Sequence, residues 1–97
     1  MTQEEFLAAL ASTQDWAWGV DRTGDLRAMR NGRLYCPLTA VAESRLRTYF
    51  RTSAYDDAAV ALGVDDDLAN DIVSAADGIF DDEATQLRRQ LEMAVGL

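Results

Sequence analysis

The sequence predicts a helix-dominated α+β fold, in which a small three-stranded antiparallel meander packs on a bundle of about five helices. In five segments, apolar residues recur at helical spacing behind a polar capping residue or a proline. Between the first two of these segments the apolar residues alternate instead, and Asn31-Gly32 is typical of a two-residue hairpin. A chain of 97 residues with 48% apolar types suits a single globular domain over residues 1–97.

The N-terminal helix is expected to begin after Thr2 and to end near residue 12. The Thr2 hydroxyl can accept a hydrogen bond from the amide of Glu5, and the Glu5 carboxylate can accept one from the amide of Thr2. A first strand follows, because Trp16, Trp18 and Val20 alternate with smaller residues. The chain therefore changes from helical spacing to strand spacing within its first twenty residues.

The second and third strands are predicted at residues 26–30 and 34–36, on either side of the hairpin turn. This register places Met29 opposite Leu34 and Arg30 opposite Arg33. Two like charges on facing strand positions repel each other. We therefore expect the two arginine side chains either to splay into water or to hold an anion.

The second and third helices are predicted from a proline and from a second capping pattern. Pro37 suits the first turn of a helix, and the apolar spacing that follows it continues to about Phe50. Ser53, with Asp56 three residues later, favours the start of the next helix, and Gly63 is expected to stop it.

The fourth and fifth helices are predicted to begin at clusters of acidic residues. One of Asp65, Asp66 and Asp67 is expected to cap the fourth helix, and Asp81 or Asp82 the fifth. Carboxylates accept hydrogen bonds from the free amides of a helix start and oppose the positive end of its dipole. Capping needs one such residue, so each cluster holds more carboxylates than capping explains.

The charges also divide the chain into two parts. Residues 22–51 hold seven arginines and two acidic residues, whereas residues 54–83 hold nine aspartates, one glutamate and no basic residue. Such segregation steers an oppositely charged partner toward one surface. We therefore expect an acidic face that binds a basic protein and consists of Asp65, Asp66, Asp67, Asp71, Asp81, Asp82 and Glu83. Arg88 and Arg89 are expected to lie outside this contact.

Neither a metal ion nor duplex DNA is expected at the acidic face. A calcium loop needs ligands at alternating positions, a glycine sixth and a glutamate twelfth, but Asp65 and Asp67 are followed by Ala69. Residues 58–76 also resemble a helix-turn-helix in their small, turn and core positions. The outward side of its second helix would carry Asp66, Asp67 and Asp71, which the phosphates of DNA repel.

A basic and aromatic group in the hairpin region supports an alternative function. Arg27, Arg30 and Arg33 lie close in sequence to Trp16 and Trp18. Ribbons of this kind bind single-stranded nucleic acid by base stacking and phosphate contact. Against this stands the net charge of −8, since nucleic-acid-binding domains are usually basic. The competing interpretation places the tryptophans in the core and pairs the arginines with the acidic half.

Other functional classes find little support in the composition. The chain has no histidine and a single cysteine, so Cys36 has no imidazole base to activate it and is expected to be a buried structural residue. We expect no enzyme activity and no cofactor. A lone cysteine suits the reducing cytoplasm, and the longest uncharged runs are far shorter than the roughly 20 residues of a membrane span.

Four short segments resemble a loose group of small bacterial and phage-borne proteins. They are Cys36–Ala42, Leu62–Val64, Ile72–Val73 and Ala75–Asp77. In size and charge the chain is also similar to the inhibitors that phages use against host defences, including anti-CRISPR proteins. The resemblance implies an inhibitor, encoded by a phage or mobile element, that occupies a basic nucleic-acid-binding surface of a host defence protein. It assigns no functional residue.

Overall fold

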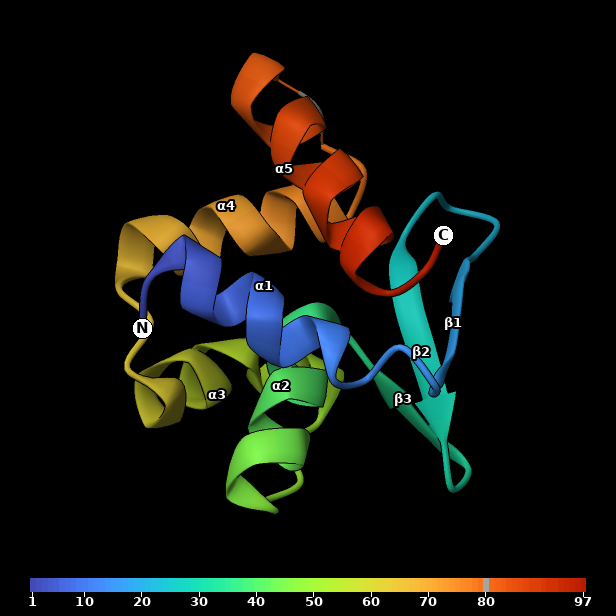
Figure 1. Ribbon diagram of the computed structural model, residues 1–97, viewed down its shortest axis with the longest axis vertical. Coiled ribbons are helices and arrows are strands. Elements are labelled where there is room, and N and C mark those ends of the chain that lie inside the picture. The colour runs from blue at the N-terminus through green and yellow to red at the C-terminus, as the bar shows by residue number, and fades with distance from the viewer. Residues whose placement is uncertain (80) are drawn as a thin grey trace.

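The computed structural model describes residues 1–79 and 81–97, in which five α-helices lie beside one three-stranded sheet (Figure 1). The elements are α1 (Gln3–Ala11), β1 (Ala17–Val20), β2 (Leu26–Arg30), β3 (Arg33–Tyr35), α2 (Pro37–Leu46), the 3-10 turn η1 (Thr52–Ala54), α3 (Tyr55–Leu62), α4 (Asp66–Ala76) and α5 (Asp82–Ala94). The predicted helix-dominated α+β fold is confirmed.

The sheet is an antiparallel meander in the order β1-β2-β3. Its register pairs Met29 with Leu34 and Arg30 with Arg33, as predicted. Asn31 and Gly32 have φ angles of 53° and 75°, and a two-residue turn with both central residues left-handed matches the twist of its strands. The third strand begins and ends one residue earlier than predicted.

Helix α2 occupies the centre of the molecule. It contacts three other helices, α1, α3 and α4, and it also contacts the strands β2 and β3. All six residues from Pro37 to Ala42 are buried. A helical segment that is enclosed on every side needs apolar or small residues all round, and the first six residues of α2 are of these types. The rest of the core, including Phe6, Leu10, Ile72 and Leu91, packs around it.

The prediction that this helix continues to Phe50 is wrong. Helix α2 ends at Leu46, because Arg47 adopts a left-handed conformation with φ 55° while its amide donates to the carbonyl oxygen of Glu43. The chain then leaves the helix axis, and the ring of Tyr49 packs edge-on against Tyr35 with 5.9 Å between centroids. A tertiary ring contact thus overrides the helical spacing of the sequence.

The predicted start of the third helix is also corrected. The 3-10 turn precedes α3, which begins at Tyr55 behind Ala54, and no side chain caps it. Ser53 therefore lies in the turn instead of capping the helix. Gly63 does end α3 as predicted, with φ 72°.

Three of the predicted helix starts are confirmed by hydrogen bonds. The capping box of α1 joins Thr2 and Glu5 in both directions, at 3.2 and 3.0 Å, and hydrogen bonds from Thr2 hold the pKa of Glu5 below its ordinary value. Asp65 caps α4 by accepting from the amide of Leu68 at 2.8 Å. Asp81 caps α5 by accepting from the amide of Ala84, also at 2.8 Å. The local sequence therefore determines where these helices begin.

Candidate functional site

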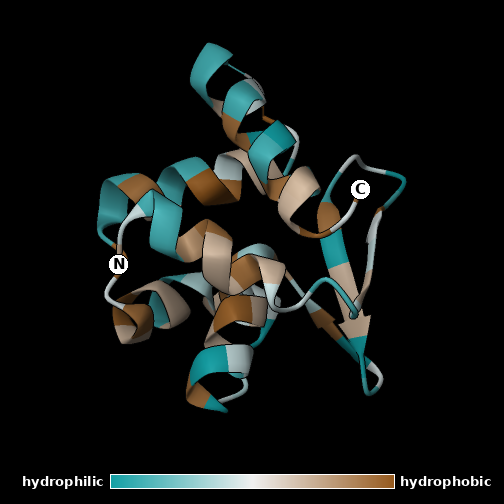
Figure 2. Cartoon of the chain, in the orientation of Figure 1, coloured by the Kyte–Doolittle hydropathy of each residue, from teal (hydrophilic) through white to brown (hydrophobic). Residues whose placement is uncertain are grey.

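All seven residues of the acidic face are exposed. They are Asp65, Asp66, Asp67, Asp71, Asp81, Asp82 and Glu83. Figure 2 shows hydrophilic residues along the first turns of both α4 and α5. Two members, Asp65 and Asp81, use a carboxylate oxygen to cap a helix and remain at the surface while they do so. The other five have no capping role.

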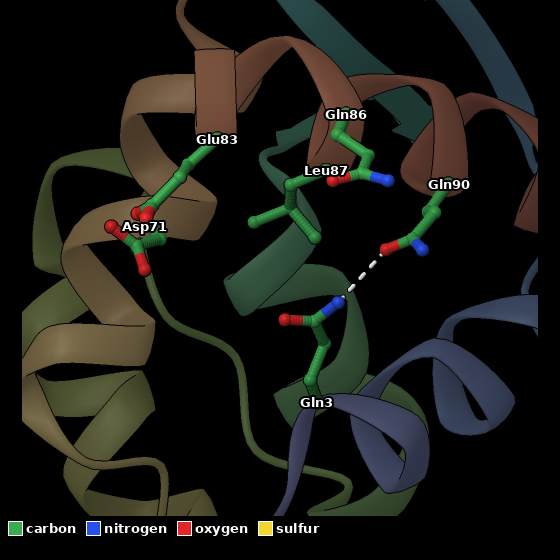
Figure 3. A pocket seen from close by; sticks show the side chains of 6 residues that line it. All are labelled: Gln3, Asp71, Glu83, Gln86, Leu87 and Gln90. Atoms are coloured by element: carbon green, nitrogen blue, oxygen red, sulfur yellow. Dashed lines mark hydrogen bonds between the residues drawn. The ribbon is translucent and has the colours of Figure 1, made fainter. Parts of the chain in front are cut away.

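One acidic residue of α4 and one of α5 line a groove between these two helices. Asp71 lies midway along α4 and Glu83 in the first turn of α5, and their carboxylates point toward each other (Figure 3). The groove encloses about 240 Å³. The packing of α5 on α4 therefore brings Asp71 and Glu83, which are separated in sequence, to one groove.

The remaining walls of this groove are uncharged. Leu87 supplies an apolar side chain between the two helices, and Gln86 lines the same side (Figure 3). Gln3 of α1 donates a hydrogen bond of 2.8 Å to the side-chain oxygen of Gln90, which closes the far end. The groove thus offers two carboxylates at one end and amides at the other.

The arginines of the chain do not neutralise the acidic face. In the described residues, the ion pairs within 4.0 Å join Arg27 to Asp25, Arg27 to Asp77 and Arg88 to Glu92. None of these acids belongs to the acidic face. The described residues also contain no group of three or more cysteine, aspartate or glutamate side chains that could hold a metal ion. The negative charge of this surface is therefore open to a partner.

Arg30 and Arg33 face each other across the hairpin, and each stacks on a different aromatic ring. The Arg30 guanidinium lies 4.5 Å from the centroid of Trp16, and that of Arg33 lies 4.3 Å from Tyr49. Tyr35 lies between these rings, with its centroid 5.1 Å from that of Trp16. Both residues are exposed, and each guanidinium is held by its own ring in a cation–π contact. The expectation that the pair holds an anion stays a prediction.

Arg27 does not join this group. Its guanidinium donates a hydrogen bond of 2.7 Å to the carboxylate of Asp77, at the end of α4, and lies 3.6 Å from Asp25. Burial disfavours the charged form of Arg27, but the hydrogen bond and the charge of Asp77 outweigh it and raise the pKa. The interpretation in which an arginine pairs with the acidic half therefore holds for Arg27, whereas Arg30 and Arg33 stay exposed.

The two tryptophans also separate. Trp18 packs against the main core, and its indole N–H donates to the carbonyl oxygen of Thr13 at 2.9 Å. Trp16 lies just before β1 and packs against the small cluster around Tyr35. Trp18 is thus a half-buried structural residue, and Trp16 is the tryptophan that accompanies the arginines.

Cys36 is buried, as the sequence predicts, with 6% of its surface exposed. It occupies the residue before α2, where its amide donates to the hydroxyl of Thr39 at 3.0 Å. The thiol lies 3.5 Å from the same hydroxyl. Through these contacts with Thr39, Cys36 helps to form the first turn of α2.

The sequence interpretation missed the role of Arg88. Arg88 is buried, and its guanidinium donates hydrogen bonds to the carbonyl oxygens of Ala75 and Ala76 at the end of α4, at 2.9 and 3.0 Å. It also donates to the carbonyl oxygen of Gly24. Arg88 lies four residues after Ala84 on the buried stripe of α5, which is the signal that could have revealed it. Arg89, its neighbour, is exposed.

Comparisons with known proteins add no relative to these observations. No family model matches the chain. No curated protein and no solved structure matches it either. Among the helices of the described residues, none has the length and apolar run that crossing a membrane requires.

Proposed function

We propose that this chain is a small binding protein whose acidic face occupies a basic, nucleic-acid-binding surface of another protein. By this proposal it acts in the cytoplasm as an inhibitor of the kind that phages and mobile elements direct against host defence, anti-CRISPR proteins included. The observation that carries the proposal is the pair of carboxylates, Asp71 and Glu83, which point toward each other across the groove between α4 and α5 (Figure 3).

Two facing carboxylates repel each other unless a cation lies between them. In the described residues no arginine reaches either one within 4.0 Å. A guanidinium or ammonium group from a partner would relieve this repulsion, and its aliphatic stem could lie along Leu87. The groove is therefore suited to a basic side chain that normally contacts phosphate.

The surrounding carboxylates act at longer range. Exposed charges of one sign raise the rate of encounter with an oppositely charged surface more than they add contact energy. The clusters 65–67 and 81–83 lie at the starts of the two helices that form the groove. They would steer a basic surface toward it, and a row of carboxylates would replace the row of phosphates that such a surface binds.

The alternative, a nucleic-acid-binding module built on the hairpin, has a smaller basis. Arg27 is engaged by Asp77, so Arg30 and Arg33 are the members of the predicted group that remain exposed. Each is stacked on its own aromatic ring. Two exposed arginines on a chain of net charge −8 provide only weak electrostatic attraction for the phosphates of a nucleic acid.

The acidic face is tested with the double variant Asp71→Asn/Glu83→Gln. Its charge-matched control is Asp56→Asn/Asp57→Asn, which removes two exposed carboxylates from α3. We expect the first variant to associate with a nona-arginine peptide several-fold more slowly at low salt, and the control to differ little from the unaltered chain. An equal fall of the association rate in both variants would show that net charge alone attracts the peptide. That result would contradict the proposal that the groove is the binding site.

The inhibitor role is tested in bacterial cells whose CRISPR effector destroys an incoming plasmid. Expression of the chain is expected to restore transformation, the control variant is expected to do the same, and the Asp71→Asn/Glu83→Gln variant is expected to restore less. If the chain restores transformation with none of the effector types, the inhibitor role is contradicted. Rescue that survives the double variant but fails in Arg30→Ala/Arg33→Ala would move the function to the hairpin.

A further inference from the structure

A second cavity lies on a part of the molecule that the acidic face does not include. It encloses about 500 Å³ where the end of α1, the end of β2 and the last turn of α2 come together. Four charged side chains line it: Arg30, Arg47, Asp15 and Glu43. Trp16 forms an aromatic wall beneath Arg30. The cavity therefore has both signs of charge and no formal net charge.

These four charged side chains, all among the described residues, do not form ion pairs with one another. In the described residues, no ion pair within 4.0 Å joins any two of them. The Arg30 guanidinium is fixed by the Trp16 ring at 4.5 Å, which leaves the N–H groups at its edge free for an acceptor. Arg47 is the exposed residue that follows the end of α2, in a left-handed backbone conformation. Two guanidinium groups on one cavity are suited to a carboxylate.

Glu43 supplies a negative charge that favours a cationic group in the same cavity. Its Oε2 atom is buried and has no hydrogen-bond partner among the described residues. A buried carboxylate oxygen without a donor is costly, so such groups are normally hydrogen-bonded. The ends of two helices, Ser12 after α1 and Arg47 after α2, also line this cavity. Their partial negative charge favours a cation.

We propose that this cavity binds a zwitterionic ligand, namely a free amino acid or short peptide that carries an ammonium and a carboxylate group together. The carboxylate is received by Arg30 and Arg47, and the ammonium is attracted by the negative charges of Glu43 and Asp15, which line the same cavity. A ligand of this class has no net charge, so the net charge of −8 on the chain does not oppose its approach. That charge does oppose a nucleotide or free phosphate.

The direct test compares three probes by NMR, with the indole N–H of Trp16 and the amide of Ser44 as reporters. Glycylglycine carries both groups, N-acetyl-glycylglycine has no ammonium, and glycylglycinamide has no carboxylate. We expect saturable shifts with glycylglycine and at least tenfold weaker binding of the two blocked peptides. Equal binding of N-acetyl-glycylglycine would make this a plain anion site, equal binding of glycylglycinamide a plain cation site, and either result, like the absence of saturation, overturns the proposal.

Variants assign the two halves of the site. Glu43→Gln keeps the size of the side chain and is expected to abolish the preference for glycylglycine over N-acetyl-glycylglycine. Arg47→Gln is expected to abolish the preference over glycylglycinamide. Arg22→Gln, at an exposed residue of the β1–β2 turn, removes the same charge and is expected to change neither preference. If Arg22→Gln removes the preference over glycylglycinamide as fully as Arg47→Gln does, the assignment of Arg47 to the ligand carboxylate is overturned.

Discussion

The guanidinium of Arg88 donates a hydrogen bond of 2.9 Å to the carbonyl oxygen of Gly24, sixty-four residues earlier in the chain. The same side chain binds two carbonyl oxygens at the end of α4. One buried arginine thereby connects α5, α4 and the β1–β2 turn. Because α4 and α5 carry the acidic face, Arg88 also maintains the crossing at which Asp71 meets Glu83.

Replacing Arg88 with methionine is expected to destabilise the protein by about 3 kcal/mol, because buried carbonyl oxygens lose a charged donor. Urea denaturation gives the difference in the free energy of unfolding. Arg89→Met is the matched control, since this neighbour is exposed, and it is expected to change stability by no more than about 0.5 kcal/mol. Equal effects of the two substitutions would show that the hydrogen bonds of Arg88 contribute nothing measurable.

The pH dependence of stability is expected to include a contribution from Asp21. Hydrogen bonds from the Thr23 hydroxyl and the Asp25 amide lower the pKa of this carboxyl. A lowered folded-state pKa stabilises the protein above the unfolded-state pKa, and this gain is lost as the pH falls through the folded-state pKa. Asp21→Asn is therefore expected to melt lower than the unaltered chain at pH 7. The difference is expected to vanish in strong acid, and one that persists there would contradict the assignment.

A substitution at Gly32 is expected to weaken the hairpin. Gly32 has φ 75°, and an alanine there is strained by about 1–2 kcal/mol even though nothing lies within 4 Å of the added Cβ. Gly19, in β1, has equal space and no positive φ, so Gly19→Ala is expected to stay within about 0.5 kcal/mol. Thermal unfolding of the two variants separates backbone strain from crowding. Equal destabilisation would point to strand packing instead.

Cys36 is expected to tolerate serine better than a buried thiol ordinarily does. A hydroxyl among apolar groups without a partner costs about 1–3 kcal/mol. Serine at the residue before a helix can instead accept a hydrogen bond from the amide of Thr39, so we expect Cys36→Ser to cost less than Cys36→Ala. Native alkylation of the thiol is expected to be far slower than alkylation in urea. Fast native alkylation would mean that the thiol is accessible.

Features that depend on a few neighbouring residues could be predicted from the sequence. The hairpin register follows from Asn31-Gly32, since that pair adopts the left-handed conformations that the turn requires. Asp65 and Asp81 cap α4 and α5 because a carboxylate beside free amides has a local reason to bind them. The exposure of the acidic face could be predicted as well, because its seven residues are all aspartate or glutamate.

Features that depend on distant partners could not be predicted. An arginine at position 88 looks like a surface residue until the carbonyl oxygens of α4 are placed beside it. The pairing of Arg27 with Asp77 joins residues that are fifty positions apart. Tyr49 continues the helical spacing of α2 in the sequence, but in the structure its ring packs against Tyr35 of β3. The meeting of Asp71 with Glu83 depends on the helix crossing.

The burial of the first six residues of α2 also determines which parts of this chain can change over evolutionary time. The six residues from Pro37 to Ala42 have no open side, so nearly every exchange there alters volume inside a close-packed interior. Asp71 and Glu83 are exposed, so an exchange at either position alters no volume inside the packed interior. We expect descendants of this chain to retain α2 while the rest drifts, so that common ancestry survives as a short internal segment.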